Sequence, residues 1–456
     1  MKSDPSISGI GELVPDLPRK VGFWGAIAVM VGVVIGSGIF RTPTTIAQNL
    51  GDPWMILALW LAAGLIALCG ALTFAELAAM MPHSGGIYVF IREGFGSCPA
   101  FVFGWTYMLI TKPAAAGGIA FIFAEYFNTL TGLQWNPALL TCSALFVLTL
   151  INVIGVREST GFSMVVTALK YSALVGVIAL GLFRVVYGGA STVGTLAQSA
   201  VEIPLWKGVL VALTLIMWTY DGWSDIGAIA GEIKNPERTL PRVYISGTLA
   251  VIGLYLLVNL VYLWFVPLPE MRGSKTIAMT TVERLTGPTG ATLIAVVIII
   301  STLGSSHASV MTGARVTFAQ ARDGLLFRFL GRISPRFETP AVALWVQLAL
   351  SCLAVTLLKN FESLASSFVF TMWIFYGMGA IALFVLRARR HQHARPFRVP
   401  GYPIVPLIFV LASVGMTVLS IVADPGSTLP WIGVLFAGVP VYFVWRWLYP
   451  AAHAAV

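Results

Sequence analysis

Charged residues are scarce in this chain of 456 residues. Asp, Glu, Lys and Arg make up 10% of it, whereas apolar residues make up 57%. A soluble protein of this size uses roughly a quarter of its residues as charged groups to cover its surface. This shortage excludes a soluble globular protein. With uncharged runs that repeatedly exceed the roughly 20 residues of a spanning helix, it predicts an all-α membrane protein.

Cysteine is also rare, and its placement argues against disulfides and metal. Three of the four cysteines lie inside apolar runs, the fourth lies at the end of one, and no Cys-x-x-Cys occurs. We therefore expect no structural disulfide and no metal site. A nucleophile and a base are suggested by Ser305, Ser306 and His307, but sequence neighbours on one helix do not face each other, and no acid is near. We expect no enzyme and no cofactor.

Twelve apolar runs are long enough to cross a bilayer, and the connections between them are too short for a soluble domain. These runs cover residues 22–44, 53–80, 97–127, 136–156, 161–184, 206–231, 242–267, 288–314, 339–358, 363–386, 402–423 and 428–449.

The net charge of +9 indicates how the chain is oriented in the membrane and does not indicate nucleic-acid binding. With the N-terminus placed inside, nineteen of the Lys and Arg residues, Arg315 among them, fall in inner segments and seven in outer segments. The excess on one side predicts that both termini are cytoplasmic. Lys112 and Lys170 belong to neither group, because both fall inside predicted spans.

The first apolar run contains Gly36-Ser37-Gly38, and two glycines around a serine weaken a helix. In hydrocarbon, an opened backbone is tolerated where it is buried in protein or lines a watery cavity. The half-helix from Ile39 would direct its N–H groups and positive end at the break, which suits a carboxylate. Close approach of a ligand, or a positive φ, would explain Gly38. Helix packing through Gly32 and Gly36 is the alternative.

Asp221, Gly222 and Asp225 interrupt the sixth apolar run. Acids at membrane depth usually face a cavity or a partner. A run that ended at Tyr220 would be short for a span, so a second broken helix fits better than an interfacial position for the acids.

Breaks in the first and sixth spans predict an inverted repeat of five plus five helices, with the site at the midplane. The chain would then divide into a cytoplasmic segment 1–21, a first repeat 22–187, a second repeat 206–388 and two additional helices 402–449.

Several motifs in the correct order resemble one family over nearly the whole chain. They are 31–40 (VGVVIGSGIF), 76–77 (EL) with 82–88 (PHSGGIY), 111–113 (TKP), 218–223 (WTYDGW) with 231–241 (GEIKNPERTLP), 322–324 (RDG) and 395–400 (RPFRVP). In combination they are similar to the L-type amino acid transporter branch of the amino acid–polyamine–organocation superfamily. The resemblance implies the LeuT-like fold of that superfamily.

The resemblance also implies a substrate site at the two breaks, formed by residues on either side of each. The carboxylate would bind the N–H groups of Ser37 and Gly38 and the Ser37 hydroxyl, beside Gly36. The amine would bind exposed carbonyls near Val34 and Ile35, and near Trp218 and Thr219. Trp218 would close over the substrate, with simple packing as the alternative. The remaining residues assigned to the site at the second break are Tyr220, Asp221 and Gly222.

Lys170 lies near the middle of an otherwise uncharged span, where an ammonium costs about 2.5–3.5 kcal/mol. It lies too far from either end to reach water easily. The resemblance implies that its ammonium replaces a sodium ion between spans one and eight. Lys112 is a weaker candidate for coupling, since it could satisfy the carbonyl that Pro113 frees.

These features predict a sodium-independent exchanger of neutral amino acids that works by alternating access. Proton-coupled uptake remains an alternative, because a buried lysine can titrate. Transport of basic amino acids or polyamines is another, because Asp221 lies beside the site. Asp221 could face a basic substrate, Lys112 or solvent, or it could order the break by accepting backbone N–H bonds. We see no polar stripe of the kind that would line a channel.

In the family that these motifs resemble, eukaryotic members pair with a heavy-chain subunit through a cysteine between spans three and four. Here that loop, residues 128–136, has no cysteine. We therefore expect no disulfide-linked subunit and a multi-pass protein of the bacterial inner membrane. Its expected partners are lipid and small amino acid substrates, with no nucleic acid.

Overall fold

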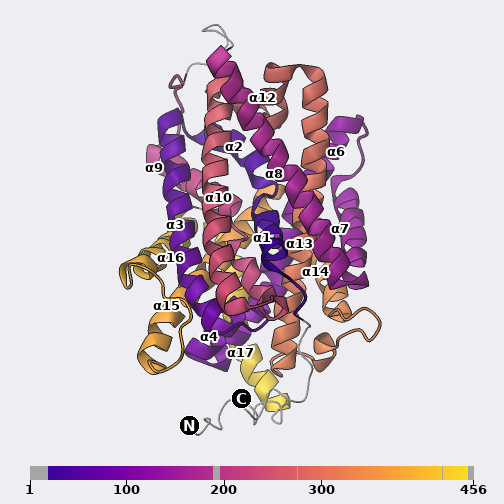
Figure 1. Cartoon of the computed structure of the whole chain (residues 1–456), viewed down its shortest axis with the longest axis vertical. Helices are drawn as coiled ribbons and strands as arrows, with labels where there is room; N and C mark the ends of the chain where they lie inside the picture. Colours follow the sequence, from indigo (N-terminus) through magenta and orange to yellow (C-terminus); the bar gives the residue numbers. More distant parts are fainter. Residues whose placement is uncertain (1–18, 188–195, 275, 424, 450–456) are drawn as a thin grey trace.

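The computed structural model describes residues 19–187, 196–274, 276–423 and 425–449. Within these ranges the chain is helical, and its one β-bridge joins Val21 to Ile233. The long helices run along the longest axis of the molecule, as Figure 1 shows. The predicted all-α fold is confirmed.

The first half of the chain forms nine helical segments before the described chain is interrupted after Tyr187. They are α1 (Phe23–Val34), α2 (Gly38–Asn49), α3 (Pro53–Met80), α4 (Ile87–Phe95), α5 (Ser97–Thr106), the π-helical turn η1 (Tyr107–Thr111), α6 (Lys112–Thr131), α7 (Pro137–Ile154) and α8 (Val156–Tyr187). Local sequence sets several of these starts. Asp52 and Asn136 each cap a helix through side-chain bonds to backbone N–H groups and precede a proline at the first helical position.

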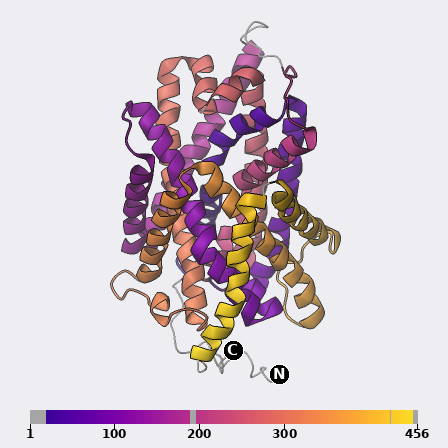
Figure 2. The same cartoon turned by 180° about the vertical axis from the view of Figure 1, so that it is seen from behind.

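The second half of the described chain forms eleven further helical segments. Its segments are α9 (Leu205–Tyr220), the 3₁₀-helix η3 (Trp223–Glu232), α10 (Pro236–Phe265), α11 (Leu268–Gly273), α12 (Ile277–Thr286), α13 (Pro288–Arg322), η4 (Arg328–Gly331), α14 (Ala341–Leu358), α15 (Phe361–Arg389), α16 (Ile404–Ala423) and α17 (Pro425–Leu448). Seen from behind in Figure 2, α17, in yellow, lies along the outside of the bundle, where it packs on α5, α15 and α16.

Eleven stretches of the described chain are long and apolar enough to cross a membrane. The sixth predicted run, 206–231, is not among them, because it is divided between α9 and η3. With 16 residues, α9 is shorter than the roughly 20 that a straight span needs. The twelfth span therefore remains a prediction, which requires α9 and η3 to cross the bilayer together.

The packing of the helices is of the kind that an inverted repeat produces. Segments that would be equivalent in the two repeats pack on each other, namely α3 with α10, α6 with α13, and α7 with α14, while α2 packs on α9 as α1 packs on η3. Mixed contacts also come in matched pairs, such as α7 with α13 and α6 with α14. We propose on this basis that the repeats 22–187 and 206–388 are related by a two-fold axis.

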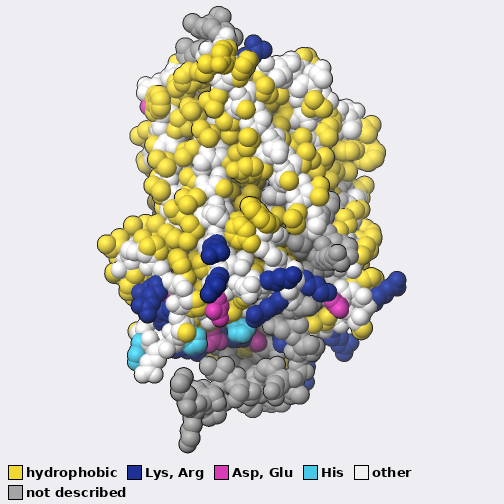
Figure 3. Space-filling view, in the orientation of Figure 1, with side chains coloured by type: hydrophobic (Ala, Val, Ile, Leu, Met, Phe, Trp, Pro, Cys, Tyr) yellow, Lys and Arg dark blue, Asp and Glu magenta, His cyan; other side chains and the backbone are white. Residues whose placement is uncertain are grey.

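Charged side chains gather at one end of the bundle, where Figure 3 shows a band of Lys and Arg on the visible face. Figure 1 places α4 at this end, which we call the basic end. Glu76 has no exposed surface and accepts bonds from Arg387 and, at 2.7 Å, from the backbone N–H of Val399. That the basic end faces the cytoplasm remains a prediction from the charge bias.

A second ion-pair group at the basic end joins α4 to α13 and α15. Arg92 pairs with Asp323 and with Glu93, and Arg390 donates to Glu93 at 2.7 Å. Burial by itself raises the pKa of Glu93, but Arg92 and Arg390 outweigh it and hold the pKa below its ordinary value. The carboxylate therefore stays charged and keeps these helix ends together.

One predicted assignment at this end is wrong. The eighth run was expected to end at residue 314 and to leave Arg315 in an inner loop, but α13 continues to Arg322. Arg315 is completely buried and pairs with Glu232 of η3 at 2.9 Å. The helix continues because Arg315 finds a buried carboxylate, which compensates for placing its charge out of water.

Candidate functional site

The first span is broken where predicted. α1 ends at Val34, α2 begins at Gly38, and Ile35, Gly36 and Ser37 connect the two. The first N–H groups of a helix have no acceptor within it, so those of α2 face the break. The Ser37 hydroxyl is buried and has no hydrogen-bond partner in the described chain.

The predicted reason for Gly38 is partly wrong. Gly38 is the first residue of α2 and does not have a positive φ. A side chain is excluded instead by packing, since a Cβ there would lie 2.6 Å from Oγ1 and 2.9 Å from Cα of Thr219. The glycine allows α2 to lie directly against α9.

The second break lies opposite the first. α9 ends at Tyr220, Asp221 is extended, and Gly222 has a φ of 110°, which favours glycine. A Cβ on Gly222 would lie 2.7 Å from the Val33 side chain. The two breaks therefore approach each other closely, and this approach brings segments from both halves of the chain to one place.

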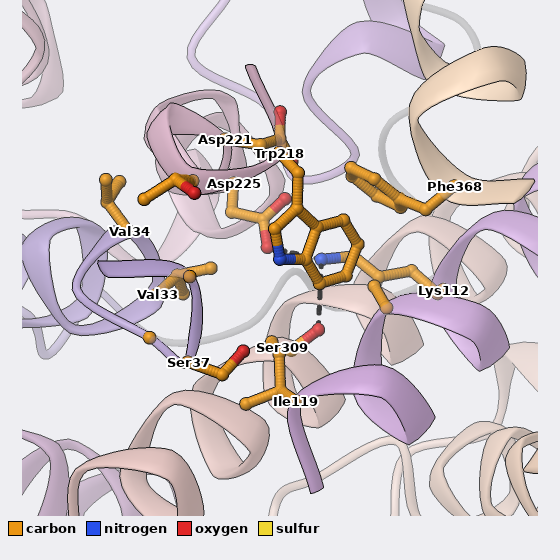
Figure 4. Close-up of a pocket in the computed structure, with 14 residues that line it drawn as sticks. Val33, Val34, Ser37, Lys112, Ile119, Trp218, Asp221, Asp225, Ser309 and Phe368 are labelled. Carbon is orange, nitrogen blue, oxygen red and sulfur yellow. Dashed lines mark hydrogen bonds and ion pairs between the residues drawn. The ribbon is translucent and has the colours of Figure 1, made fainter. Parts of the chain in front are cut away.

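A small cavity of about 30 Å³ lies between the two breaks. That volume is the share of one or two water molecules, so an amino acid can enter only if the walls move apart. Figure 4 shows Ser37, Trp218, Asp225, Ser309 and Lys112 around its centre. The lining residues are Val33, Val34, Gly36, Ser37, Gly38, Lys112, Ala115, Ile119, Trp218, Thr219, Asp221, Asp225, Ser309 and Phe368.

Three residues assigned to the site by sequence do not line this cavity. The backbone carbonyl of Ile35 points away and accepts from Lys170, while Tyr220 and Gly222 hold the second break without facing the cavity. The Val34 carbonyl, expected to be exposed, accepts from the Tyr255 hydroxyl at 2.7 Å.

Lys170 lies behind the first break. Its ammonium donates to the carbonyls of Gly32 and Ile35 and to the Ser305 hydroxyl of α13, the last two at 2.8 Å. The residue is 1% exposed. The Ser305 hydroxyl also lies 2.7 Å from the Gly32 carbonyl oxygen and 2.9 Å from that of Ile35, and its one proton can be donated to either. The lysine thus joins α8 to α1 and α13 at the point where α1 ends.

Lys112 has a different partner from those considered on sequence. Its ammonium forms an ion pair with Asp225 of η3, and both side chains are nearly buried. Thr312 donates to Asp225 Oδ2 at 2.7 Å, and Lys112 Nζ lies 3.3 Å from Thr312 Oγ1. Lys112 therefore pairs with neither Asp221 nor the carbonyl before Pro113.

Asp221 accepts a hydrogen bond from the Tyr376 hydroxyl of α15. The same hydroxyl lies 2.9 Å from Ser224 Oγ. Asp221 also lines the cavity, and the Tyr376 side chain that bonds to its carboxylate is neutral.

The Trp218 side chain lies between the cavity and α15. It contacts Phe361 and Phe368 edge to face, with ring centroids 5.7 Å and 5.2 Å away. A Cβ on Gly118 of α6 would lie 3.5 Å from the indole. The ring is thus held by aromatic packing on one side and leaves its other face to the cavity.

Asp225, Ser309 and Phe368 line the cavity but were not assigned to the site from sequence. Asp225 carried a signal, since an acid within an apolar run needs a partner. Ser309 and Phe368 carried none, because serine and phenylalanine are ordinary residues of membrane helices.

Comparison with known proteins assigns this arrangement to a family. The model of the amino acid permease family matches residues 21–444, which include both breaks and all the cavity residues. The chain belongs to the amino acid permease family. Its fold is therefore that of a membrane transporter of amino acids, and the resemblance seen in the sequence motifs is confirmed.

Relatives of this permease come from bacteria and mammals. The serine/threonine exchanger SteT of Bacillus subtilis (strain 168) is 32% identical over 434 residues, which cover 94% of this chain and 97% of SteT. The mouse b(0,+)-type amino acid transporter 1 is 30% identical over 448 residues, 94% of this chain and 90% of its own. The human cystine/glutamate transporter is 30% identical over 444 residues, which cover 95% of this chain and 86% of that transporter. The names of these relatives specify different amino acid substrates. The substrate of this chain must therefore be inferred from the residues of its own cavity.

Proposed function

We propose that this permease exchanges neutral L-amino acids across the cytoplasmic membrane by sodium-independent alternating access. The observation that carries the proposal is the pairing of opposite helix ends at the cavity. The N-terminus of α2 and the C-terminus of α9 both lie at the cavity. A helix has partial positive charge at its N-terminus and partial negative charge at its C-terminus, which together complement a zwitterion.

The carboxylate of the substrate would bind at the start of α2. The N–H groups of Ser37 and Gly38 are unsatisfied within the helix, and the Ser37 hydroxyl is buried beside them without a partner. A buried hydroxyl without a partner costs free energy unless a ligand supplies the bond. The amine would bind carbonyls of the last turn of α9, near Trp218 and Thr219. The Thr219 carbonyl is favoured, since those of Val34, Ile35 and Trp218 accept other hydrogen bonds.

Neutral substrates are favoured because the charges of the cavity are already matched in part. Lys112 is paired with Asp225, so its ammonium does not attract an acidic side chain. A carrier of basic amino acids is the second candidate, because Asp221 faces the cavity and its hydrogen-bond partner, the Tyr376 hydroxyl, is neutral.

Sodium independence is supported by the position of Lys170. Its ammonium lies among two carbonyls and a hydroxyl from α1 and α13, oxygen ligands of the kind that a hard cation would use. A fixed positive charge there leaves no place for a sodium ion. The lysine would also transmit movement of α1 to α8 and α13 during alternating access.

Transport by purified protein in proteoliposomes tests the proposal. Labelled alanine, serine or threonine should enter vesicles loaded with unlabelled substrate, with the same rate when external sodium is replaced by choline. Entry into empty vesicles driven by an inward proton gradient would show symport instead of exchange. A requirement for sodium would contradict the proposal, and so would strong inhibition by arginine that Asp221→Asn removes.

Replacing Ser37 with alanine should change binding and stability in opposite directions. Loss of a hydrogen bond to a carboxylate costs about 1.5–3 kcal/mol, so KM should rise roughly 10- to 150-fold. The empty protein should be equally or more stable, because the variant removes a buried hydroxyl that lacks a partner. Substrate competition and thermal denaturation in detergent measure the two effects.

Ser301 provides a matched control on α13. Its hydroxyl is also buried without a partner, but it does not line the cavity. Ser301→Ala should leave KM unchanged. If Ser37→Ala binds substrate as well as Ser301→Ala does, the carboxylate is held elsewhere.

A further inference from the structure

A polar cluster of four residues lies at the cavity, and three of them, Lys112, Asp225 and Ser309, line it. It consists of Lys112 of α6, Asp225 of η3, and Ser309 and Thr312 of α13. Figure 4 shows Lys112, Asp225 and Ser309 turned toward one another beneath the indole of Trp218. Three separate helical segments therefore supply one buried hydrogen-bonding group.

The cluster retains bonding capacity that faces the cavity. Within the described chain, Asp225 accepts from Lys112 and from Thr312 through the same oxygen, Oδ2, which leaves Oδ1 to accept another bond. The hydroxyl of Ser309 lies 3.5 Å from Lys112 Nζ, at the limit of a hydrogen bond. Both Asp225 and Ser309 line the cavity. A hydroxyl group can both donate and accept, so it suits this mixed arrangement.

We propose that this cluster is the side-chain subsite of the permease and that it selects a short hydroxylated side chain, that of serine or threonine. The hydroxyl of the substrate donates to Asp225 Oδ1 and accepts from Ser309 or Lys112. The inference rests on the proposed function, since it assumes that the α-amino and carboxylate groups bind at the two breaks.

The remaining walls explain why the side chain must be short. Ala115 and Ile119 of α6 and Phe368 of α15 are apolar and lie beside the cluster, where they can contact the methyl group of threonine. The cavity holds only about 30 Å³, so a larger side chain requires larger displacement of packed helices.

Charge and polarity exclude the other classes. An acidic side chain would lie against Asp225 and Asp221, and Lys112 is already paired. A basic side chain would meet the Lys112 ammonium. Apolar side chains of the same size as serine and threonine, those of alanine and valine, would fit but would leave the ion pair without the additional bond, and a site built for a hydroxyl discriminates against analogues that lack it.

Isosteric pairs of amino acids test the subsite directly. Exchange of labelled serine into serine-loaded proteoliposomes is measured against unlabelled threonine or valine, and against serine or alanine. We expect threonine to compete roughly 10- to 100-fold better than valine, and serine better than alanine to a similar degree, as a bond to a charged group predicts.

Two variants assign this preference to the cluster. Ser309→Ala should reduce the preference for threonine over valine several-fold, whereas Ser301→Ala on the same helix should not change it. The double variant Lys112→Met and Asp225→Leu replaces the ion pair with apolar groups of similar size, which proteins often tolerate. In this variant the preference for threonine over valine should disappear.

The outcomes separate this inference from the proposed function. If the wild-type protein exchanges valine and alanine as well as threonine and serine, the subsite is overturned and the neutral exchanger stands. If Ser309→Ala keeps the full preference and so does the double variant, another group holds the hydroxyl and the subsite is overturned as well. If no neutral amino acid is exchanged at all, the proposed function itself is wrong.

Discussion

Replacing Lys170 with alanine is expected to slow turnover by about 10- to 150-fold or more. This is the range for loss of one hydrogen bond from a charged group. The ammonium makes three contacts that join α8 to the end of α1 and to α13. Without it, α1 loses its link to α8 and α13, the helices against which α1 moves in the proposed mechanism. Binding should weaken less than turnover, because Lys170 does not line the cavity.

The measurement compares the exchange rate at saturating substrate with the apparent affinity in competition assays. Lys170→Met, which keeps most of the side-chain volume without the charge, shows whether packing alone is sufficient. Both variants should be slow, and the wild type should be indifferent to sodium. Normal exchange by Lys170→Met would show that coupling does not require the ammonium.

Replacing Arg315 with methionine should destabilise the protein by about 3–5 kcal/mol, since it leaves a buried carboxylate without its partner. Arg315 and Glu232 have side chains that are each 1% exposed and lie 2.9 Å apart. The pair joins the end of η3 to α13, and Arg315 also donates to the Met311 carbonyl at 2.8 Å. We expect this variant to give less folded protein and an earlier thermal transition in detergent.

Two further variants control this experiment. Adding Glu232→Gln to Arg315→Met removes the unpaired charge and should restore most of the lost stability. Lys20→Ala breaks an exposed pair with Glu338, whose side chains are 50% and 61% exposed, and should cost about 0–1 kcal/mol. An equally small effect of Arg315→Met would mean that water reaches Glu232.

The membrane class and the two helix breaks could be predicted from the sequence. Both depend on local chemistry, because an uncharged run has one favourable environment, and glycines or acids within it interrupt a helix wherever the chain folds. The position of Lys170 in the middle of its span could be predicted for the same reason. Its link to spans one and eight came from the family resemblance, and the structure places its ammonium between α1 and α13.

The composition of the cavity could not be predicted in the same way. Lys112 pairs with Asp225, which lies 113 positions away, and contacts Ser309, which lies 197 positions away. Neither the spacing nor the residue types of these three point to one another. The role of Gly38 was similarly hidden, because its obstacle is Thr219, a residue of the other half of the chain.

The sequence by itself therefore determined that the chain is helical, spans a membrane and opens its first and sixth helical runs. Which side chains meet at those openings was decided by the tertiary structure, because the packing of α6, η3 and α13 places their polar groups together. A charged residue within an apolar run indicates that a partner is needed, since the bilayer makes an unpaired charge costly. The identity of that partner depends on which helix faces lie together, and only the fold fixes this.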